Sequence, residues 1–330
     1  MAAIGLGVKY KNAVSSCTEC AYMTPSQRYS FWREQLSYNH DPWDKIHSSL
    51  SHQYHPYGWP TVSQRSLLPF ASLALLYANR SIVRLPQHRP FANALVHIEY
   101  MDSYHRNALR TLSRTIALNV KHVLVVGDAP FPHTSVMSIW NRFPTNITWW
   151  CTNPAQNLSG INIFPRGIAN ALNWAQVLRS APAIPLKSQL LHCGYMNLRT
   201  NPKRRSKLQA LQNNGFQCNA SNVDFATSAA SLRASHFVAS PRGNGPQNHR
   251  DWEALMMGAI PIVDYDPITE PLWTHLPVVR VSNWSIVTPT FLWSTLAEMR
   301  QREYNYETMD ISYYVNTMGL GRWEELSSWS

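Results

Sequence analysis

The chain has 330 residues, of which 45% are hydrophobic and 15% charged, and its formal net charge is +10. This composition excludes a disordered chain, and the length predicts two domains rather than one. The positive charge favours anionic partners, but the one dense basic cluster is residues 201–207 (NPKRRSK). Nucleic-acid grooves usually carry longer basic stripes with aromatic residues between them, so we expect no nucleic-acid partner.

Residues 1–65 show little hydrophobic periodicity, and we expect loops and short helices there. Cys17 and Cys20 form a Cys-x-x-Cys pair with histidines after it, but no second tight ligand pair completes a zinc motif. The five cysteines of the chain are an odd number and do not indicate a disulfide framework.

Residues 1–12 lack the apolar region of a secretory signal, and the longest apolar run, 67–78, is too short to span a bilayer. The expected location is therefore the cytoplasm, without a membrane segment. The alternative is the Golgi lumen, if the sequence is a trimmed piece of a longer protein. In that lumen the Asn-x-Ser/Thr sequons would matter; they begin at Asn79, Asn146, Asn157, Asn219 and Asn283.

From residue 66 the pattern alternates between helix and strand. Apolar residues at helical spacing predict helices, and short apolar runs predict strands. Four consecutive apolar residues, Val123–Val126, indicate a strand buried on both faces, as in a parallel sheet. The other elements predicted in this half are helices at 66–80, 106–120 and 134–143 and strands at 146–152 and 161–165.

A connector at 179–187 contains two prolines, and we place the domain boundary after residue 185. A second alternating series follows in residues 186–330. Its predicted strands lie at 188–194, 236–240, 260–263 and 277–281, its helices at 202–215, 225–235 and 288–302, and one or two more helices within 307–328. The predicted fold class is α/β, with two Rossmann-like halves that bind ligands at the carboxyl ends of their strands.

The segment SPRGNGPQNHRDWEALMMGAIPIVDYDP, residues 240–267, contains the strongest candidate site. Glycines in the turn allow close approach of the backbone to a ligand, and a helix that begins after Asn248 would present its N-terminus to a phosphate. Arg242 and His249 could then neutralise a diphosphate leaving group without a metal, and Glu253 could accept hydrogen bonds from ribose hydroxyls. The spacing fits equally an ordinary tight turn and a helix with an Arg250–Glu253 ion pair.

This segment, continued by LPVVRVSNWSIVTPTFL (276–292) and preceded by GYMNLRTNPKRR (194–205), resembles the signature of exostosin-type glycosyltransferases, including algal and viral relatives. The shared elements are a PRG turn, an HRxWEAL helix, a GxIPxV strand and a final helix that begins with a TP-type turn. The resemblance covers residues 186–300 and departs from the family at Gln247 and Asn248. It implies a GT-B fold, with two facing Rossmann-like domains and a cleft between them.

The resemblance also implies the substrates and their binding residues. Residues 1–185 would form the acceptor-side domain, and residues 186–330 would bind a UDP-sugar. Arg242 would face the diphosphate, with Gly243, Asn244 and Gly245 in the turn, His249 and Arg250 near it, and Glu253 on the ribose. Arg204 or Arg205 would add a phosphate contact, although a solvated basic helix start explains these two equally well.

An inverting transfer needs a base that takes the proton from the acceptor hydroxyl. Asp128 is the predicted catalytic base, because it follows Gly127 directly after the apolar strand 123–126, although Asp is also a common turn residue. The reserve candidates are Glu99, Asp102 and His133.

Asp264-Tyr265-Asp266 has the spacing of a metal-binding Asp-x-Asp. A turn before Pro267 explains it as well, so we predict no metal and no required cofactor. The expected function is an inverting, metal-independent transfer of xylose, glucuronic acid, galactose or a similar sugar from a UDP-sugar to a hydroxyl of a glycan or glycoprotein. The alternatives are a metal-dependent glycosyltransferase that uses Asp264 and Asp266, or a non-catalytic glycan- or nucleotide-binding relative.

Overall fold

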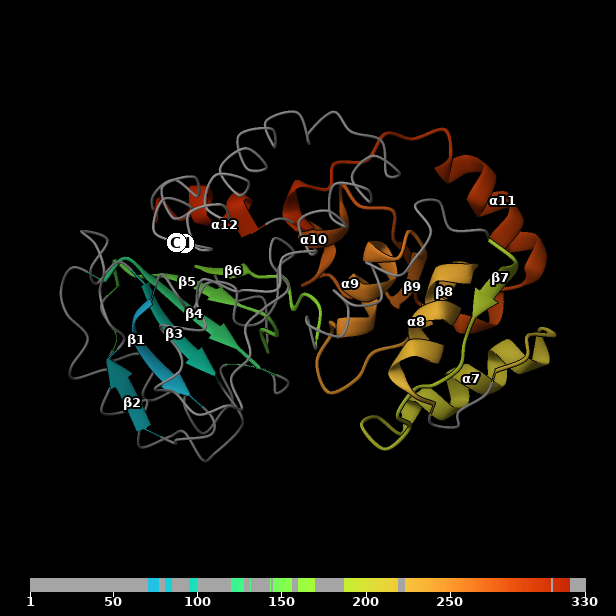
Figure 1. Ribbon diagram of the computed structural model, residues 1–330, viewed down its shortest axis with the longest axis horizontal. Coiled ribbons are helices and arrows are strands. Elements are labelled where there is room, and N and C mark those ends of the chain that lie inside the picture. Colours follow the sequence, from blue (N-terminus) through green and yellow to red (C-terminus); the bar gives the residue numbers. More distant parts are fainter. Residues whose placement is uncertain are drawn as a thin grey trace, which may run out of the picture. The chain divides into compact units, whose positions relative to one another are not determined.

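A computed structural model describes residues 71–76, 81–84, 95–99, 120–127, 131, 143, 145–155, 160–169, 187–218, 223–309 and 311–320. These residues fall into two compact units. The first contains the described residues up to 166 and those from 307 onward, and the second contains residues 167–306. Each unit is built on a sheet of mainly parallel strands, so the predicted α/β character is confirmed (Figure 1).

The first sheet has six strands in the order β2-β1-β3-β4-β5-β6. Only the β1–β2 pair is antiparallel, and all other neighbours are parallel. The predicted strands at 123–126, 146–152 and 161–165 are confirmed. The bounds are β1 Ala71–Leu76, β2 Ser81–Arg84, β3 Leu95–Glu99, β4 His122–Val126, β5 Thr148–Cys151 and β6 Ile161–Ile163.

The prediction of a helix at 66–80 is wrong, because residues 71–76 of that segment form β1. This strand pairs with β3 in parallel, with Leu75 opposite Ile98, and with β2 in antiparallel, with Leu75 opposite Ile82. The run ASLALL has almost no polar residues to set a period, so it suits a strand with two neighbours as well as a helix. The pairing on both sides determines the outcome.

The second sheet has four parallel strands in the order β10-β9-β8-β7. The strands and helices predicted within 188–302 are confirmed, whereas the short helix at 270–273 was not predicted. The strands are β7 Gln189–His192, β8 Ser235–Ser240, β9 Ile260–Asp264 and β10 Val279–Val281. The helices are α7 Lys203–Asn213, α8 Phe225–Ala234, α9 His249–Met256, α10 Glu270–Trp273 and α11 Pro289–Met299, with a short 3-10 helix at Trp284–Ile286.

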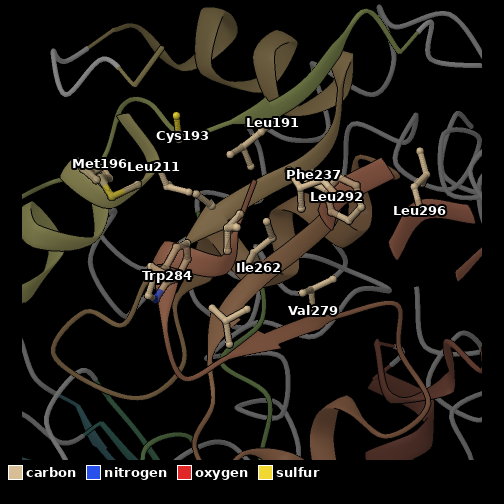
Figure 2. Packing of buried hydrophobic residues seen from close by; sticks show 14 of the residues in the cluster. Leu191, Cys193, Met196, Leu211, Phe237, Ile262, Val279, Trp284, Leu292 and Leu296 are labelled. Atoms are coloured by element: carbon tan, nitrogen blue, oxygen red, sulfur yellow. The ribbon is translucent and has the colours of Figure 1, made fainter. Parts of the chain in front are cut away.

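Both faces of the second sheet are covered by helices. On one face, Phe237 and Ile262 pack in one hydrophobic cluster with Leu211 of α7 and with Leu292 and Leu296 of α11 (Figure 2). Helices α8 and α9 contact β8, and α9 also contacts β9. Such double coverage explains why the strands are apolar on both sides, and it leaves the strand ends as the places where polar side chains gather.

The helix α12, Ile311–Thr317, belongs to the first unit although it follows the whole second unit in sequence. The ring of Tyr314 lies 4.7 Å from that of Phe164 and 6.4 Å from that of Trp150, centroid to centroid. A helix within 307–328 is thereby confirmed. The predicted boundary after residue 185 falls within 170–186, outside the described residues, and stays a prediction.

Several predictions fall on parts of the chain that the structure does not describe. They are the helices at 106–120 and 134–143, apart from residues 120 and 143 at their ends, and the Cys17–Cys20 pair. Within the described ranges, no helix has the length and hydrophobicity needed to cross a bilayer.

Candidate functional site

The candidate site in the second unit lies at the carboxyl end of β8. After Ser240 the chain forms a loop, residues 241–248, here called the PRG loop, and α9 begins at His249. Asn248 is extended, with φ −124° and ψ 157°, and its N–H donates to the Asp251 carboxylate (2.7 Å). Asn248 is therefore the N-cap, as predicted, and the loop leads directly into a helix N-terminus.

Gly243 is the tightest point of the PRG loop. A Cβ atom at this position would lie 2.7 Å from Asn248 Oδ1 and 3.0 Å from Arg204 Nη2. Both atoms are fixed by hydrogen bonds, since Arg204 Nη2 donates to Asn248 Oδ1 (2.9 Å) and Asn248 Nδ2 donates to Pro241 O (3.2 Å). Only glycine fits without displacing this contact.

Arg204 and Asn201 bind the carbonyl groups of the PRG loop. The Nε of Arg204 donates to Pro241 O and Arg242 O, both at 3.1 Å, and Asn201 Nδ2 donates to Gly243 O at 3.0 Å. Arg204 Nη1 donates in addition to Asn197 O and Thr200 Oγ1. Burial lowers the pKa of Arg204, and the nearby carboxylates of Asp251 and Asp264 partly offset this. Arg204 thus stabilises the shape of the loop; the phosphate contact predicted for it remains untested.

Arg242 is bound by two carboxylates at the end of β9, Asp264 as the last residue of the strand and Asp266 just after it. Its main-chain N–H donates to Asp264 Oδ2 (2.6 Å), and its guanidinium Nη1 pairs with Asp266 Oδ2 (3.0 Å). The side chain of Arg242 is 40% exposed, whereas that of Asp266 is 12% exposed. Arg242 is consequently the partly exposed cation of the loop, at the carboxyl edge of the second sheet.

Each of the four oxygens of the Asp-x-Asp carboxylates already has a hydrogen-bond donor. Asp264 Oδ2 also accepts from Lys207 Nζ (2.6 Å), and its Oδ1 accepts from Trp284 Nε1 (2.8 Å). Asp266 Oδ1 accepts from the N–H of Ile268 (3.0 Å), as in the predicted turn. A metal ion would have to displace an ammonium group, a guanidinium group or both, so this donor set does not fit the metal-dependent alternative.

Arg250, which follows the N-cap by two residues, contacts the end of β7. Its Nη1 donates to Gly194 O (2.7 Å) and its Nη2 to Tyr195 O. Tyr195 has φ +56°, a left-handed conformation that is unfavourable for a bulky residue, and the two hydrogen bonds stabilise this turn. Burial lowers the pKa of Arg250 to about 10, opposed by the nearby Glu253 carboxylate. The predicted position of Arg250 near a diphosphate stays a prediction.

His249 and Glu253 lie on one side of α9, as their spacing predicts, and both contact residues 167–169. The ring Nδ1 of His249 is 2.7 Å from Gly167 O, and Glu253 Oε1 accepts from the N–H of Ala169 (3.3 Å). Residues 167–169 therefore lie beside the helix start. The roles predicted for His249 at a diphosphate and for Glu253 at a ribose are not tested by these contacts.

Two buried ionisable groups lie close to these elements. Burial raises the pKa of Asp251 to about 7, against the hydrogen bond from the Asn248 N–H. Burial also lowers the pKa of His192, at the end of β7, to about 4, and the positive charge of Arg250 adds to this shift. Both pKa shifts favour the neutral form of the group, so His192 adds no positive charge to this region near neutral pH.

The remaining predicted binding residues differ in exposure. Asn244 is exposed and Gly245 is buried within the PRG loop. Arg205 is exposed on α7, and no hydrogen bond or ion pair joins its side chain to another described residue, as expected for the solvated helix start. The proposed phosphate contact of Arg205 stays a prediction.

The predicted base Asp128 lies outside the described residues, as do the reserve candidates Asp102 and His133. Only the backbone of Glu99 is described, at the end of β3. Gly127, the residue before Asp128, is described in detail. Its carbonyl oxygen accepts from Asn153 Nδ2 (2.7 Å), Thr152 Oγ1 (3.2 Å) and Arg166 Nη1 (3.3 Å). The peptide leading to Asp128 is thereby fixed by side chains that follow β5 and β6.

A disulfide joins Cys193 to Cys218, with their Cα atoms 4.9 Å apart. The sequence indicated no disulfide framework, and it did not predict this single bond. The bond links the end of β7 to the segment after α7 and closes a loop that contains Arg204 and Lys207. An odd number of cysteines leaves at least one unpaired and so gave no indication of this bond. Cys151 is a free, buried cysteine. Among the described residues, no group of His, Cys, Asp and Glu could hold a metal ion.

The residues that sequence reasoning missed are those that bind the PRG loop from a distance. Lys207 and Trp284 lie 57 and 20 residues along the chain from their partner Asp264, and Asn201 lies 42 residues from its partner Gly243. No local pattern indicates such pairs, although Lys207 belongs to the basic cluster 201–207. The chain matches no known family model, and no curated protein matches its sequence.

Proposed function

We propose that the chain is a glycosyltransferase of GT-B type that binds a UDP-sugar at the PRG loop of the second unit. The observation that carries the proposal is the arrangement at the end of β8. There a glycine-containing loop leads into a helix N-terminus and presents a partly exposed Arg242. A diphosphate is the anion that such a combination of arginine, main-chain N–H groups and helix dipole suits best.

The resemblance to exostosin-type enzymes and two separate, mainly parallel sheets support the GT-B part of the proposal. In open α/β sheets, ligands bind outside the carboxyl ends of the strands. Arg242 follows β8 and Gly127 follows β4, so each lies at such an end. The first unit would then bind the acceptor and the second the donor.

In the proposed reaction, Asp128 accepts the proton of an acceptor hydroxyl. The oxygen of that hydroxyl attacks the anomeric carbon of the donor sugar from the side opposite to UDP. The bond between that carbon and the diphosphate oxygen breaks, and UDP leaves with the electron pair. Arg242 and the N-terminus of α9 stabilise the charge that develops on UDP. The configuration of the sugar inverts.

The proposal is metal-independent because both carboxylates of Asp264-Tyr265-Asp266 already bind cationic side chains. Turnover of a panel of UDP-sugars, including UDP-xylose, UDP-glucuronic acid and UDP-galactose, is measured with oligosaccharide acceptors in EDTA. We expect full activity with one donor in EDTA and a loss of at least 100-fold in Asp128→Asn. Activity that disappears in EDTA and returns with Mn²⁺ would overturn the metal-free reaction.

The same panel decides between the enzyme and a non-catalytic relative. UDP binding without transfer from any donor, unchanged in Asp128→Asn, would assign a binding protein instead. Of the two expected locations, the Cys193–Cys218 disulfide favours the oxidising Golgi lumen over the cytoplasm.

A further inference from the structure

Asp264 and Asp266 both bind Arg242, one at its main chain and the other at its side chain. Asp264 accepts from its main-chain N–H at 2.6 Å, and Asp266 pairs with its guanidinium at 3.0 Å. The two carboxylates that the spacing would assign to a metal thus define the position of a single arginine. This arrangement fixes the backbone and the side chain of Arg242 together.

The carboxylates are themselves fixed by other donors. Lys207 and Trp284 occupy the two oxygens of Asp264, and Trp284 is only 4% exposed. The main-chain N–H of Ile268 binds the second oxygen of Asp266. Because neither carboxylate can rotate without losing a hydrogen bond, Arg242 is held by a rigid support.

Part of the guanidinium group of Arg242 remains available for a ligand. Within the described part of the chain, only Nη1 of Arg242 has a partner, while Nε and Nη2 make no hydrogen bond. These two donors can bind a phosphate in the bidentate geometry that suits arginine. An arginine that is already ordered loses less side-chain entropy when it binds the anion.

We propose that Asp264 and Asp266 are positioning residues that hold Arg242 ready for the phosphates of a nucleotide, and not metal ligands. This inference rests on the proposed function, because it names the support for the diphosphate contact. It requires that loss of either carboxylate weakens the binding of phosphates and leaves the binding of the nucleoside unchanged.

The test is calorimetric titration of the intact protein with UDP, uridine and inorganic pyrophosphate. In Asp266→Asn we expect the affinity for UDP and for pyrophosphate to fall about tenfold, a loss typical of one charge-assisted contact, with uridine within about twofold. Glu270→Gln is the matched control, because it breaks a carboxylate–arginine pair of similar length (2.7 Å, to Arg280) elsewhere in the same unit. The control should bind all three probes like the wild type.

Trp284→Phe is a second variant, which removes one hydrogen bond to Asp264 and keeps an aromatic ring in the core. We expect a threefold to fivefold loss for UDP and pyrophosphate only. Equal losses for uridine and UDP in both variants would show a merely structural role. Tighter UDP binding by Asp266→Asn would show that Asp266 competes with the ligand. Either result would overturn the proposal.

Two further outcomes separate this inference from the proposed function. If the wild type binds pyrophosphate with the expected dependence on Asp266 but does not bind UDP, the nucleotide-sugar function fails and the positioning role stands. If Mn²⁺ tightens UDP binding by the wild type but not by Asp266→Asn, the carboxylates bind metal and the positioning role fails. Binding of neither UDP nor pyrophosphate by the wild type overturns both.

Discussion

The carboxyl ends of β4 and β8 are both fixed by side chains from neighbouring segments, but with opposite chemistry. At Gly127 the contacts come from Thr152 and Asn153, which are fully buried, and from Arg166, which is 7% exposed. At Arg242 they come from two carboxylates. One cluster uses mainly neutral donors to one carbonyl oxygen, and the other uses several charges.

The difference follows from what each strand end is proposed to do. The residue after Gly127 would transfer a proton, so its main chain needs a fixed position. The residue Arg242 would bind an anion, so its own charge has to be held in place, and carboxylates do this. Charged clusters near the surface weaken as salt increases, whereas buried neutral hydrogen bonds do not. The predictions below use this contrast.

The largest effect is expected from Arg204→Met, which removes the donors to Pro241 O, Arg242 O and Asn197 O. Hydrogen bonds from a charged group each contribute about 1.5–3 kcal/mol, so we expect the free energy of unfolding to fall by ~3 kcal/mol. Urea denaturation measures it. Arg205→Met, on the next, exposed residue of α7, is the control. Equal stability of the two variants would show that the loop does not depend on Arg204.

Gly243→Ala should come next, with a loss of ~2 kcal/mol, because its Cβ meets Asn248 Oδ1 at 2.7 Å. The N-cap contact is disturbed, so UDP affinity should fall along with stability. Asn244→Ala, at the exposed neighbouring position, should leave the stability unchanged. A fully stable Gly243→Ala variant with normal UDP affinity would contradict the close contact.

The neutral cluster is tested by Asn153→Ala, which removes the shortest hydrogen bond to Gly127 O (2.7 Å). We expect a loss of stability of ~1 kcal/mol and a lower kcat, with UDP affinity unchanged at low and high salt. Asn162→Ala is the control, since its side chain is exposed and its bond to Trp149 O is longer (3.4 Å). A fall in UDP affinity would contradict the proposed difference between the cluster at Gly127 and the cluster at Arg242.

The last expected effect is a change in the pH dependence of stability. Burial raises the pKa of Asp251 from 3.8 to about 7, so the folded chain binds more protons than the unfolded chain between these values. This contribution makes the free energy of unfolding fall as pH rises from about 4 to 7. His192, with its pKa lowered from 6.5 to about 4, has the opposite effect between pH 4 and 6.5. Asp251→Asn should therefore give a steeper rise of stability over that range, measured by urea denaturation at each pH. If the free energy of unfolding of Asp251→Asn changes with pH in parallel with that of the wild type, the prediction is wrong.

The sequence predicted local elements well and long-range contacts poorly. Val123–Val126 gave an unambiguous strand because four apolar residues are bounded by Gly127, and Asn248 gave a helix start because its side chain suits an N-cap. The run 71–76 was predicted as helix, since six residues without a polar period suit either structure until their neighbours are known. Local sequence preference determines the secondary structure of a segment only where its contacting residues lie nearby in the sequence.

For the candidate site, sequence indicated the PRG loop and the helix after it but not what supports them. Asp266 does close the predicted turn, through Ile268, and it also binds Arg242. Asp264 could not be assigned, because its partners Lys207 and Trp284 come from elements on either side of it in sequence. Residues 264–266 form a turn and also take part in a cluster of charged side chains. The two roles can be distinguished only in the tertiary structure.

The packing of α12 on the first sheet has a consequence for synthesis of the chain. Tyr314 and Val315 are buried in the first unit, yet the ribosome adds them after every residue of the second unit. The second unit can therefore complete its own core during translation, whereas the first has to wait for its last helix. Until then the apolar surface around Phe164 that α12 will cover stays open to chaperones and to aggregation.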